Sequence, residues 1–422
     1  MRTLILGAGV SGRAAAGLAT RLGHRVVVYD RQPVTDLIGT AVISGEWDPL
    51  VLAGIDLVVA SPGFGERSAP ITDSLEAGVE VIGEVEFAWR EMDRPTVAIT
   101  GTNGKTTVTG LIADMLTASG VRAPAIGNIG SPVSDWVADP PEVLVVEMSS
   151  FQLRFIDRFH CHVAVVTNVA EDHLDWHGSV AGYRAAKTRI VEHQTDADVV
   201  VFDARDPGAV AVAGRSAARS VGVASDGSAA FGVAGDDLVW DGASVPLSAL
   251  GVDDPVYHTD LGLAGVAALE MGAHPDAVIG VAKGFTPGPH RRQVVAESAG
   301  IRWIDDSKAT NPHAALASIG AYPSVVLIAG GLAKGLDVAP LATAENVRHV
   351  IAIGESAPVL LAAAGERGHP ASSIDGAVRL AASLAAPGDV VLLAPGCASY
   401  DMFESYVARG DAFANAARSE IS

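Results

Sequence analysis

Residues 99–110 read ITGTNGKTTVTG, in which a single lysine, Lys105, lies among glycine and small hydroxyl residues. The apolar run TVAI (96–99) leads into this stretch, and the run VTGLIADML (108–116) follows it. The pattern predicts a strand, a tight turn and a helix, and backbone N–H groups at such a turn converge on an anion. We interpret it as a phosphate-binding loop, the alternative being a glycine-rich helix start with a surface lysine.

The loop is a variant of the usual phosphate-loop pattern. That pattern has a glycine five residues before the Gly-Lys pair, a position that Ile99 occupies here. Gly101, Asn103 and Gly104 supply the turn instead, and Lys105 supplies the cation. The hydroxyl of Thr106 is then placed to reach Mg²⁺.

Composition limits the possible classes of protein. A chain of 422 residues predicts two to four domains. The 49 acidic and 29 basic residues give a formal charge of −20, which argues against a surface for nucleic acid or for an anionic membrane. Any anionic substrate must therefore be held by local cationic groups.

The cellular compartment is predicted from two features. The two cysteines, Cys161 and Cys397, provide no disulfide framework, as expected for a reducing cytoplasm. The N-terminal run MRTLILGAGVSG resembles a signal peptide only superficially, because glycines interrupt its apolar stretch. The sequence contains no run of 18 apolar residues, so no membrane span is predicted. We expect a cytoplasmic protein.

Residues 1–91 alternate apolar runs with helical patterns, which predicts a parallel sheet in an α/β domain. The stretch GAGVSG (7–12) follows the first strand and opens a helix, and Asp30 ends the next strand. Taken alone, this pattern is a dinucleotide fingerprint. It leaves open a nicotinamide or flavin cofactor, another ligand that contains a nucleotide, and a purely structural turn.

Two further α/β domains follow. The phosphate loop begins a new strand–helix series in residues 92–287, and KGFTPGPH (283–290) is predicted to be a hinge. Residues 288–422 contain more short buried-strand patterns, each followed by a helix. The predicted fold is therefore three α/β domains, with a Rossmann-like first domain, a central phosphate-loop domain for ATP and a Rossmann-like third domain.

Polar residues at predicted strand ends are candidate ligands, because ligands of open α/β sheets bind outside the carboxyl ends of the strands. Glu147 ends the run VLVV, where it would bind Mg²⁺ or, alternatively, offset a helix dipole. The acidic turn NVAEDHLDWHG (168–178) makes His173 a candidate metal ligand or proton carrier, unless the turn is merely solvated. Lys187 lies on a predicted helix, where a lysine usually faces solvent.

The third domain carries its own candidates. Four polar residues each fall in a loop after one of its predicted strands, and together they would hold carboxylates or phosphates by charge-assisted hydrogen bonds. They are Lys308, Thr310, Lys334 and Ser399.

Taken together, the motifs resemble those of the Mur ligases over nearly the whole chain and in the same order. The matching stretches are TGTNGKTT, EMSSFQL, TNVAEDHLDWHGS, YRAAKTRI, PHR, DDSKATNP, GGLAKGLD and LLAPGCASYDMFESYVARGDAF. Three of them, SSFQL, DSKATN and CASYDMFESYVARG, are specific to the member of the family that adds D-glutamate. The first domain of that member is Rossmann-like and binds the UDP of its substrate.

The resemblance implies an ATP-dependent ligase of cytoplasmic peptidoglycan synthesis, acting as a monomer without nucleic acid or membrane. ATP would phosphorylate the L-alanine carboxylate of UDP-N-acetylmuramoyl-L-alanine, and the amine of D-glutamate would attack the acyl phosphate. Such a phosphoryl transfer depends mainly on positioning and charge neutralisation, which Lys105 and Mg²⁺ can provide. The third domain would bind D-glutamate and close on ATP.

The resemblance also implies roles for individual residues. Lys105, His173, Lys187 and Lys308 would be catalytic. One magnesium ion would bind at Thr106 and Glu147, and a second at His173 and Lys187, the lysine as a carbamate. ATP would contact Gly101, Thr102, Asn103, Gly104, Lys105, Thr106, Thr107, Arg291 and Asp306. Substrate would contact Ser11, Asp30 and Arg31 (uridine end), Asn128 and Gln152 (muramoyl part), and Lys308, Thr310, Lys334, Ser399 and Tyr406 (D-glutamate).

Three departures from the family pattern lie on the ATP side. Thr259 replaces an asparagine, Gln293 replaces a glutamate, and Leu332 and Ala333 stand where an acidic residue commonly precedes the lysine of the GG loop. Each is expected to weaken a contact with ATP.

Other functions remain to be weighed against this one. A folate polyglutamate ligase shares the central domain but would lack about 90 residues before the phosphate loop. A nicotinamide-dependent oxidoreductase would use GAGVSG for its cofactor, and NAD(P) rather than UDP would then stabilise it. A nucleotide sensor without catalysis would not need the full set of metal ligands.

Overall fold

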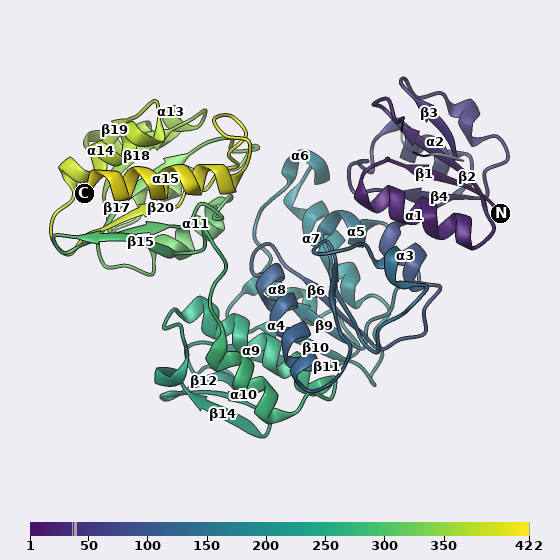
Figure 1. The fold of residues 1–422 in the computed structure, drawn as a ribbon, viewed down its shortest axis with the longest axis horizontal. Helices are drawn as coiled ribbons and strands as arrows, with labels where there is room; N and C mark the ends of the chain where they lie inside the picture. Colours follow the sequence, from purple (N-terminus) through teal and green to yellow (C-terminus); the bar gives the residue numbers. More distant parts are fainter. Residues whose placement is uncertain (36, 38–39, 422) are drawn as a thin grey trace. The chain divides into compact units, whose positions relative to one another are not determined.

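The computed structural model describes residues 1–35, 37 and 40–421. The chain forms two compact units (Figure 1). The first unit contains residues 1–169 and 176–285, and the second contains residues 170–175 and 286–422. In the part of the chain that is described, no helix is both long and apolar enough to span a membrane.

The first sheet of the first unit has five parallel strands in the order β3-β2-β1-β4-β5. Its central strands bury continuous apolar runs, as strands covered on both faces do. The strands are β1 (Arg2–Leu6), β2 (Arg25–Asp30), β3 (Ala41–Ser44), β4 (Leu57–Ala60) and β5 (Glu80–Gly83), and the helices are α1 (Val10–Arg21), η1 (Pro49–Leu52), α2 (Ala69–Glu76) and α3 (Glu84–Trp89).

The second sheet has nine strands in the order β14-β13-β12-β11-β10-β9-β6-β8-β7. The pairs β12–β13 and β13–β14 are antiparallel, and the other described pairs of this sheet are parallel. The strands are β6 (Thr96–Thr100), β7 (Ala125–Gly127), β8 (Leu144–Glu147), β9 (Val163–Val166), β10 (Val199–Asp203), β11 (Arg219–Ala224), β12 (Phe231–Ala234), β13 (Asp237–Trp240) and β14 (Ala243–Pro246).

Helices cover this second sheet, and α4 and α9 pack side by side on it (Figure 1). Gly265 of α9 allows close packing, since a Cβ there would lie 2.1 Å from Nε1 of Trp240. The helices are α4 (Lys105–Ala118), η2 (Val133–Trp136), α5 (Ser150–Arg154), α6 (Leu174–His177), α7 (Val180–Thr188), η3 (Arg189–Val191), α8 (Pro207–Ala213), η4 (Leu247–Ala249), α9 (Pro255–Glu270) and α10 (Pro275–Gly284).

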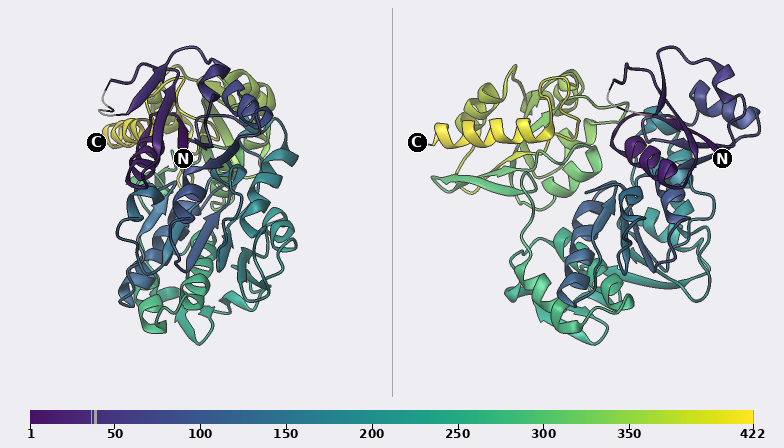
Figure 2. Two further views of the ribbon diagram at one scale, coloured as in Figure 1. Left: turned by 90° about the vertical axis from the view of Figure 1, so that its right-hand side faces the viewer. Right: turned by 45° about the vertical axis from the view of Figure 1, so that its right-hand side comes forward.

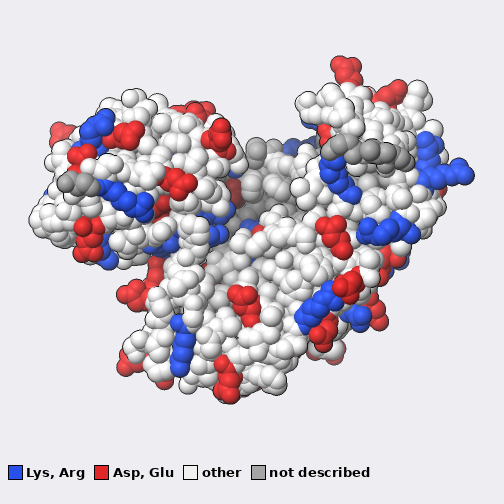
Figure 3. Space-filling model, viewed as in Figure 1, with Lys and Arg blue, Asp and Glu red and all other residues white. Residues whose placement is uncertain are grey.

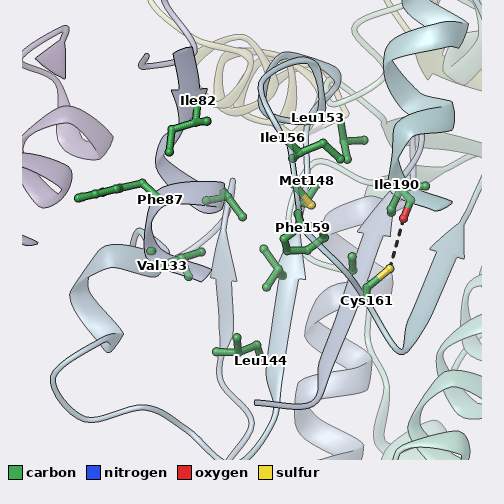
Figure 4. Packing of buried hydrophobic residues seen from close by; sticks show 14 of the residues in the cluster. Ile82, Phe87, Val133, Leu144, Met148, Leu153, Ile156, Phe159, Cys161 and Ile190 are labelled. Carbon is green, nitrogen blue, oxygen red and sulfur yellow. Dashed lines mark hydrogen bonds between the residues drawn. The ribbon is translucent and has the colours of Figure 1, made fainter. Parts of the chain in front are cut away.

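One hydrophobic cluster joins the first two sheets inside the first unit. Ile82 of β5 and Phe87 of α3 belong to the same buried cluster as Met148 and Phe159 of the central part (Figure 4). Cys161 and Ile190 belong to the same cluster, and the thiol of Cys161 donates a hydrogen bond to the carbonyl oxygen of Ile190 at 3.3 Å. Burial of a shared apolar surface is the main favourable term in such an association.

The second unit is built on a six-stranded sheet in the order β15-β16-β20-β17-β18-β19, in which β15 is antiparallel. Helices α14 and α15 pack side by side, and α15 also contacts β15 and β16 (Figure 2). The elements are β15 (Gln293–Ser298), β16 (Ile301–Asp305), α11 (Pro312–Ile319), β17 (Val325–Gly330), α12 (Ala339–Thr343), β18 (Val347–Ile353), α13 (Ala357–Ala364), η5 (Gly365–Arg367), β19 (Gly368–Pro370), α14 (Ile374–Leu384), β20 (Val390–Leu393) and α15 (Tyr406–Glu420).

These sheets confirm the predicted α/β class, in which strands alternate with helices. The boundaries expected at residues 91/92 and 287/288 remain a prediction, although the two compact units divide between Phe285 and Thr286.

On the face drawn in Figure 3, acidic and basic side chains are interspersed.

Candidate active site

Three chain segments meet at one edge of the second sheet. Strands β8, β6 and β9 are parallel neighbours, so their carboxyl ends lie side by side. The phosphate loop follows β6, Glu147 is the last residue of β8, and Thr167 follows β9. The sheet topology therefore brings together residues separated by more than 60 positions in the sequence, at the edge where such sheets bind ligands.

The backbone of the phosphate loop depends on its glycines. Gly104 has a φ of +82° and forms the N-cap of α4, a conformation that favours glycine. A Cβ on Gly101 would lie 1.8 Å from Oγ1 of Thr167. The strand–turn–helix context predicted for this loop is confirmed.

Asn168, which lies just after the neighbouring strand β9, holds the loop in place. Its side-chain oxygen accepts a hydrogen bond from the backbone N–H of Asn103 at 2.9 Å, and its backbone carbonyl accepts one from Thr102 at 2.8 Å. Its amide nitrogen donates to the carbonyl oxygen of Asn103 at 3.1 Å. The sequence showed Asn168 only as part of the acidic turn, and no local pattern revealed its contact with a loop 65 residues away.

Lys105 folds back over the loop. Its Nζ donates to the carbonyl oxygens of Gly101 at 2.9 Å and Thr102 at 3.0 Å. Thr106 and Thr107 follow it in the first turn of α4 and are half-buried. An ammonium group and the N-terminus of a helix thus lie together, which is the arrangement that binds phosphates.

Glu147 supplies a carboxylate in which one oxygen accepts a hydrogen bond and the other does not. Its Oε1 accepts a hydrogen bond from Nδ2 of Asn128 at 2.7 Å. Its Oε2 is buried and has no hydrogen-bond partner, although only 2% of the residue is exposed. Buried polar atoms are nearly always partnered, so an orphaned carboxylate oxygen fits a cation ligand. Helix α5 begins at Ser150 behind a Ser149 cap, so Glu147 does not lie in its first turn.

Lys187 is buried, and the interpretation as a solvent-facing lysine is wrong. Only 1% of Lys187 is exposed. Its Nζ donates to the carbonyl oxygen of Gly101 at 2.6 Å and to Oγ1 of Thr100 at 3.3 Å. The ring centroid of Tyr183 lies 4.9 Å from Nζ, and the Tyr183 hydroxyl lies 3.0 Å from Oγ1 of Thr102. Helix α7 therefore presents Lys187 to the phosphate loop.

Gln152 has a structural contact in addition to its expected one. Its Oε1 accepts from the backbone N–H and the hydroxyl of Ser149, both at 2.9 Å, and completes a capping box at the start of α5. The expected contact of Gln152 with substrate remains a prediction.

His173 lies in the segment that groups with the second unit. Its φ of +50° is unusual for a residue other than glycine, and its N–H donates to Oδ1 of Asp172 at 2.8 Å. Asp172 Oδ2 in turn accepts from Nδ2 of Asn311 at 3.2 Å. The expected magnesium site that combines His173 and Lys187 remains a prediction, and the side chain of Asp175 lies outside the described part of the chain.

The expected uridine site lies at the carboxyl ends of β1 and β2. Asp30 uses both carboxylate oxygens to hold its own loop, accepting from the N–H groups of Ala8 at 2.7 Å and Gln32 at 2.9 Å. The guanidinium of Arg31 lies 6.0 Å from the ring centroid of Phe64. Ser11 is half-buried in the first turn of α1. Their contacts with a nucleotide remain predictions.

In the second unit, the expected D-glutamate residues follow adjacent strands β16, β20 and β17. The ammonium of Lys308 lies 4.1 Å from the ring centroid of Tyr406, a cation–π contact. A two-residue ladder between Leu332 and Ala398 joins the loops of Lys334 and Ser399, with N–H···O distances of 2.9 and 3.0 Å. Thr310 follows Lys308, whose carbonyl accepts from its N–H at 2.8 Å.

Arg409 of α15 connects the loops of Ser307 and Cys397, and the sequence did not single it out as a functional residue. Only 1% of it is exposed. Its guanidinium donates to the hydroxyl and the carbonyl of Ser307, both at 3.0 Å, and to the carbonyl of Cys397 at 3.1 Å. Burial lowers the pKa of Arg409 to about 10. The motif CASYDMFESYVARG contained this arginine, but a buried arginine cannot be told from a surface one by sequence.

The expected ATP residues of this unit lie near its start. Burial raises the pKa of Asp306 to about 6, an effect that the nearby Arg292 guanidinium opposes at 3.9 Å. Arg291 is half-buried between His290 and Arg292. His290, Arg292 and Lys334 have φ values of +59°, +49° and +52°. Such strained conformations cluster at functional sites.

The residues that depart from the family pattern make contacts with other residues of this chain. The Thr259 hydroxyl donates to the carbonyl of Pro255 in its own helix at 3.2 Å. Oε1 of Gln293 accepts from the N–H of His290 at 3.3 Å. Leu332 forms the ladder with Ala398. Their expected effects on ATP binding remain predictions.

Two family models match the chain: the Mur ligase middle domain over residues 99–266 and the Mur ligase glutamate ligase domain over residues 290–397. The chain is 41% identical to a UDP-N-acetylmuramoylalanine–D-glutamate ligase of Frankia casuarinae, over 98% of this chain and 93% of that protein. It belongs to the Mur ligase family. A protein of the same name from Mycobacterium tuberculosis is 38% identical over 99% of this chain and 96% of its own length.

Solved structures support the fold of this Mur ligase. A MurF ligase from Thermotoga maritima matches with a TM-score of 0.62 at 16% identity, over 99% of this chain and 94% of that one. A pseudomurein peptide ligase from Methanothermus fervidus matches with a TM-score of 0.58 at 18% identity, over 94% and 97% of the two chains. Membership of the family favours the ligase over the nicotinamide-dependent oxidoreductase.

Proposed function

We propose that this Mur ligase adds D-glutamate to UDP-N-acetylmuramoyl-L-alanine at the expense of ATP, in cytoplasmic peptidoglycan synthesis and as a monomer. Mur ligases use ATP. The names of the relatives in Frankia and Mycobacterium support the two other substrates. The observation that carries the proposal is the meeting of the phosphate loop, Glu147 and Lys187 at one sheet edge.

The chemistry requires an activated carboxylate. A carboxylate is a poor electrophile, and a phosphoryl group transferred to its oxygen provides a leaving group. The transfer itself depends on positioning and on neutralisation of charge. Lys105 provides a cation at the loop, and the N–H groups at the start of α4 orient the phosphates.

The residues fit magnesium at the phosphate loop. Glu147 offers an unpartnered, buried carboxylate oxygen, and the Thr106 hydroxyl lies in the first turn of α4. Bound there, Mg²⁺ would neutralise charge on the phosphates. Among the described residues no group of three or more His, Cys, Asp and Glu side chains could hold a metal ion. Magnesium takes only one or two carboxylates and keeps several waters, so a site at Glu147 does not require such a group.

A second magnesium site would use His173 and Lys187, with Lys187 converted to a carbamate. A lysine ammonium has no lone pair for a metal, so CO₂ must first add to the neutral amine. Lys187 is buried and its Nζ lies 2.6 Å from the carbonyl oxygen of Gly101, so a carbamate formed on it would lie beside the phosphate loop.

D-Glutamate presents two carboxylates, which need two anion-binding sets in the second unit. Lys334 with Thr310 is one candidate set, and Ser399 with Tyr406 is the other. Lys308 would line the same D-glutamate site. The ladder between Leu332 and Ala398 and the contacts of Arg409 keep these loops in a fixed relation.

A phosphate-release assay tests the proposal. Release should require ATP, UDP-N-acetylmuramoyl-L-alanine and D-glutamate together, and omission of any one should reduce it to background. Release that is unaffected by omission of D-glutamate, or equal release with L-glutamate, would contradict the proposal.

A further inference from the structure

Asn128 donates two hydrogen bonds to Glu147, one to its carboxylate and one to its backbone carbonyl. Its Nδ2 donates to Oε1 of Glu147 at 2.7 Å, and its backbone N–H donates to the Glu147 carbonyl at 2.9 Å. Strand β7 places it there, because Gly127 pairs with Glu147 in the parallel register. The position of the amide relative to the carboxylate is therefore fixed by the backbone as well as by the side chain.

Gly127 makes this close approach possible. Its φ is +98°, and a Cβ on it would lie 2.6 Å from the carbonyl oxygen of Glu147. Any larger residue would be strained and would push the two strand ends apart. The chain thus uses a glycine at the point where the Asn128 amide must reach Glu147.

The two oxygens of Glu147 are consequently different. Asn128 satisfies Oε1, whereas Oε2 is buried and has no partner. A free carboxylate could rotate and exchange its oxygens, but the 2.7 Å hydrogen bond fixes one orientation. We propose that Asn128 is a positioning residue that orients Glu147 so that Oε2 can ligate a divalent cation. This inference rests on the proposed function, and it adds a role to the substrate contact expected for Asn128.

The size of the effect follows from the behaviour of other metal sites. Groups that hydrogen-bond to a metal ligand orient it, and their loss typically lowers metal affinity or activity by about 10- to 100-fold. Asn128 is exposed, so its truncation to alanine leaves no core cavity. The Asn128→Ala variant should therefore fold normally and bind the cation more weakly.

The test uses Mn²⁺ as a paramagnetic probe with the full chain, without nucleotide and without the UDP-linked substrate, because a nucleotide would itself bind Mn²⁺ in solution. Electron paramagnetic resonance counts free Mn²⁺ and gives its dissociation constant. Asn128→Ala should raise this constant about 10- to 100-fold with an unchanged Tm. Glu147→Ala should abolish binding at the same site. Arg122→Ala, which removes an exposed surface pair with Asp139 just before β7, is the matched control and should bind Mn²⁺ like the wild type.

The outcomes separate this inference from the proposed function. If Asn128→Ala binds Mn²⁺ within twofold of the wild type while only the KM for the UDP-linked substrate rises, the positioning role is overturned and the proposed function stands. If Glu147→Ala also binds Mn²⁺ normally, the metal ligand of the proposed function is wrong and the inference fails with it. In turnover assays, a weaker Mg²⁺ activation of Asn128→Ala with an unchanged KM for D-glutamate supports the positioning role.

Discussion

The side-chain nitrogen of Lys187 lies 2.6 Å from the carbonyl oxygen of Gly101, inside the phosphate loop. A residue of helix α7 thus contacts a loop that precedes it by 86 residues. Lys187 is therefore buried beside the candidate ATP site, although its sequence context is that of an ordinary lysine on a helix.

Carbamylation of Lys187 can be tested by CO₂ dependence. Stripping CO₂ from the buffer should lower activity, and bicarbonate should restore it. Lys187→Arg keeps the charge but cannot form this carbamate, so its kcat should fall at least about 100-fold. A ¹³C-bicarbonate NMR experiment should show a carbamate signal in the wild type and none in this variant. Lys283→Arg, at an exposed lysine of α10, is the control. A fully active Lys187→Arg enzyme would rule out the carbamate.

Lys105→Ala should abolish turnover and leave the fold intact. The ammonium lies over the loop carbonyls at the start of α4, where the transferring phosphoryl group would be bound. The loss of a preorganised charge at such a site costs about 3 kcal/mol or more of transition-state stabilisation, so kcat should fall at least about 100-fold. Steady-state kinetics and circular dichroism measure both effects. Wild-type turnover in a folded variant would refute the role of the loop.

Lys334→Ala should raise the KM for D-glutamate far more than the KM for ATP. The left-handed backbone of Lys334 and the ladder beside it hold the lysine in a loop of the expected amino-acid site. Initial rates with each substrate varied in turn measure the two constants. Equal increases would assign Lys334 to the nucleotide instead.

The fold was largely predictable because the alternation of apolar runs and helical patterns is local. Strands β11 to β14 escaped prediction, since their burial patterns are mixed and β12 to β14 have only four residues each. The candidate residues after strands were predictable from the edge rule for α/β sheets. Asn168 and Arg409 were not, because their roles depend on contacts with residues 65 and 102 positions away.

Glu84 should make stability depend on pH. It is buried, its Oε1 accepts from the Ser134 N–H at 2.7 Å, and burial raises its pKa from 4.5 to about 7. Between these values the folded state keeps a proton that the unfolded state loses, so stability should fall as pH rises from 4.5 to 7. Above pH 7 the loss is complete and amounts to about 3 kcal/mol at most.

Glu84→Gln removes this titration and keeps an acceptor oxygen for Ser134. Its stability gain over the wild type should appear as pH rises through this window and be largest at pH 8, measured by urea denaturation. Glu86→Gln is the contrasting variant. The carboxylate of Glu86 accepts hydrogen bonds from three backbone N–H groups and pairs with Arg90, so loss of its charge should make the Glu86→Gln protein less stable. A Glu84→Gln protein whose stability tracks the wild type at every pH would contradict the prediction.

Arg409→Met should destabilise the second unit by about 3 kcal/mol, because it leaves the buried carbonyls of Ser307 and Cys397 without their donor. Thermal unfolding of the full chain measures the loss. Arg158→Ala, whose side chain is 74% exposed, should change stability little. Equal effects of the two substitutions would show that the contacts of Arg409 contribute no more than a surface pair.

The acyl-phosphate route is the central claim, and an isotope transfer tests it most directly. The substrate is UDP-N-acetylmuramoyl-L-alanine with ¹⁸O in the alanyl carboxylate, and the released phosphate is analysed by mass spectrometry. If a carboxylate oxygen attacks the γ-phosphorus and later leaves with it, each phosphate should carry one carboxylate-derived ¹⁸O. Unlabelled phosphate, released in step with product, would contradict the account.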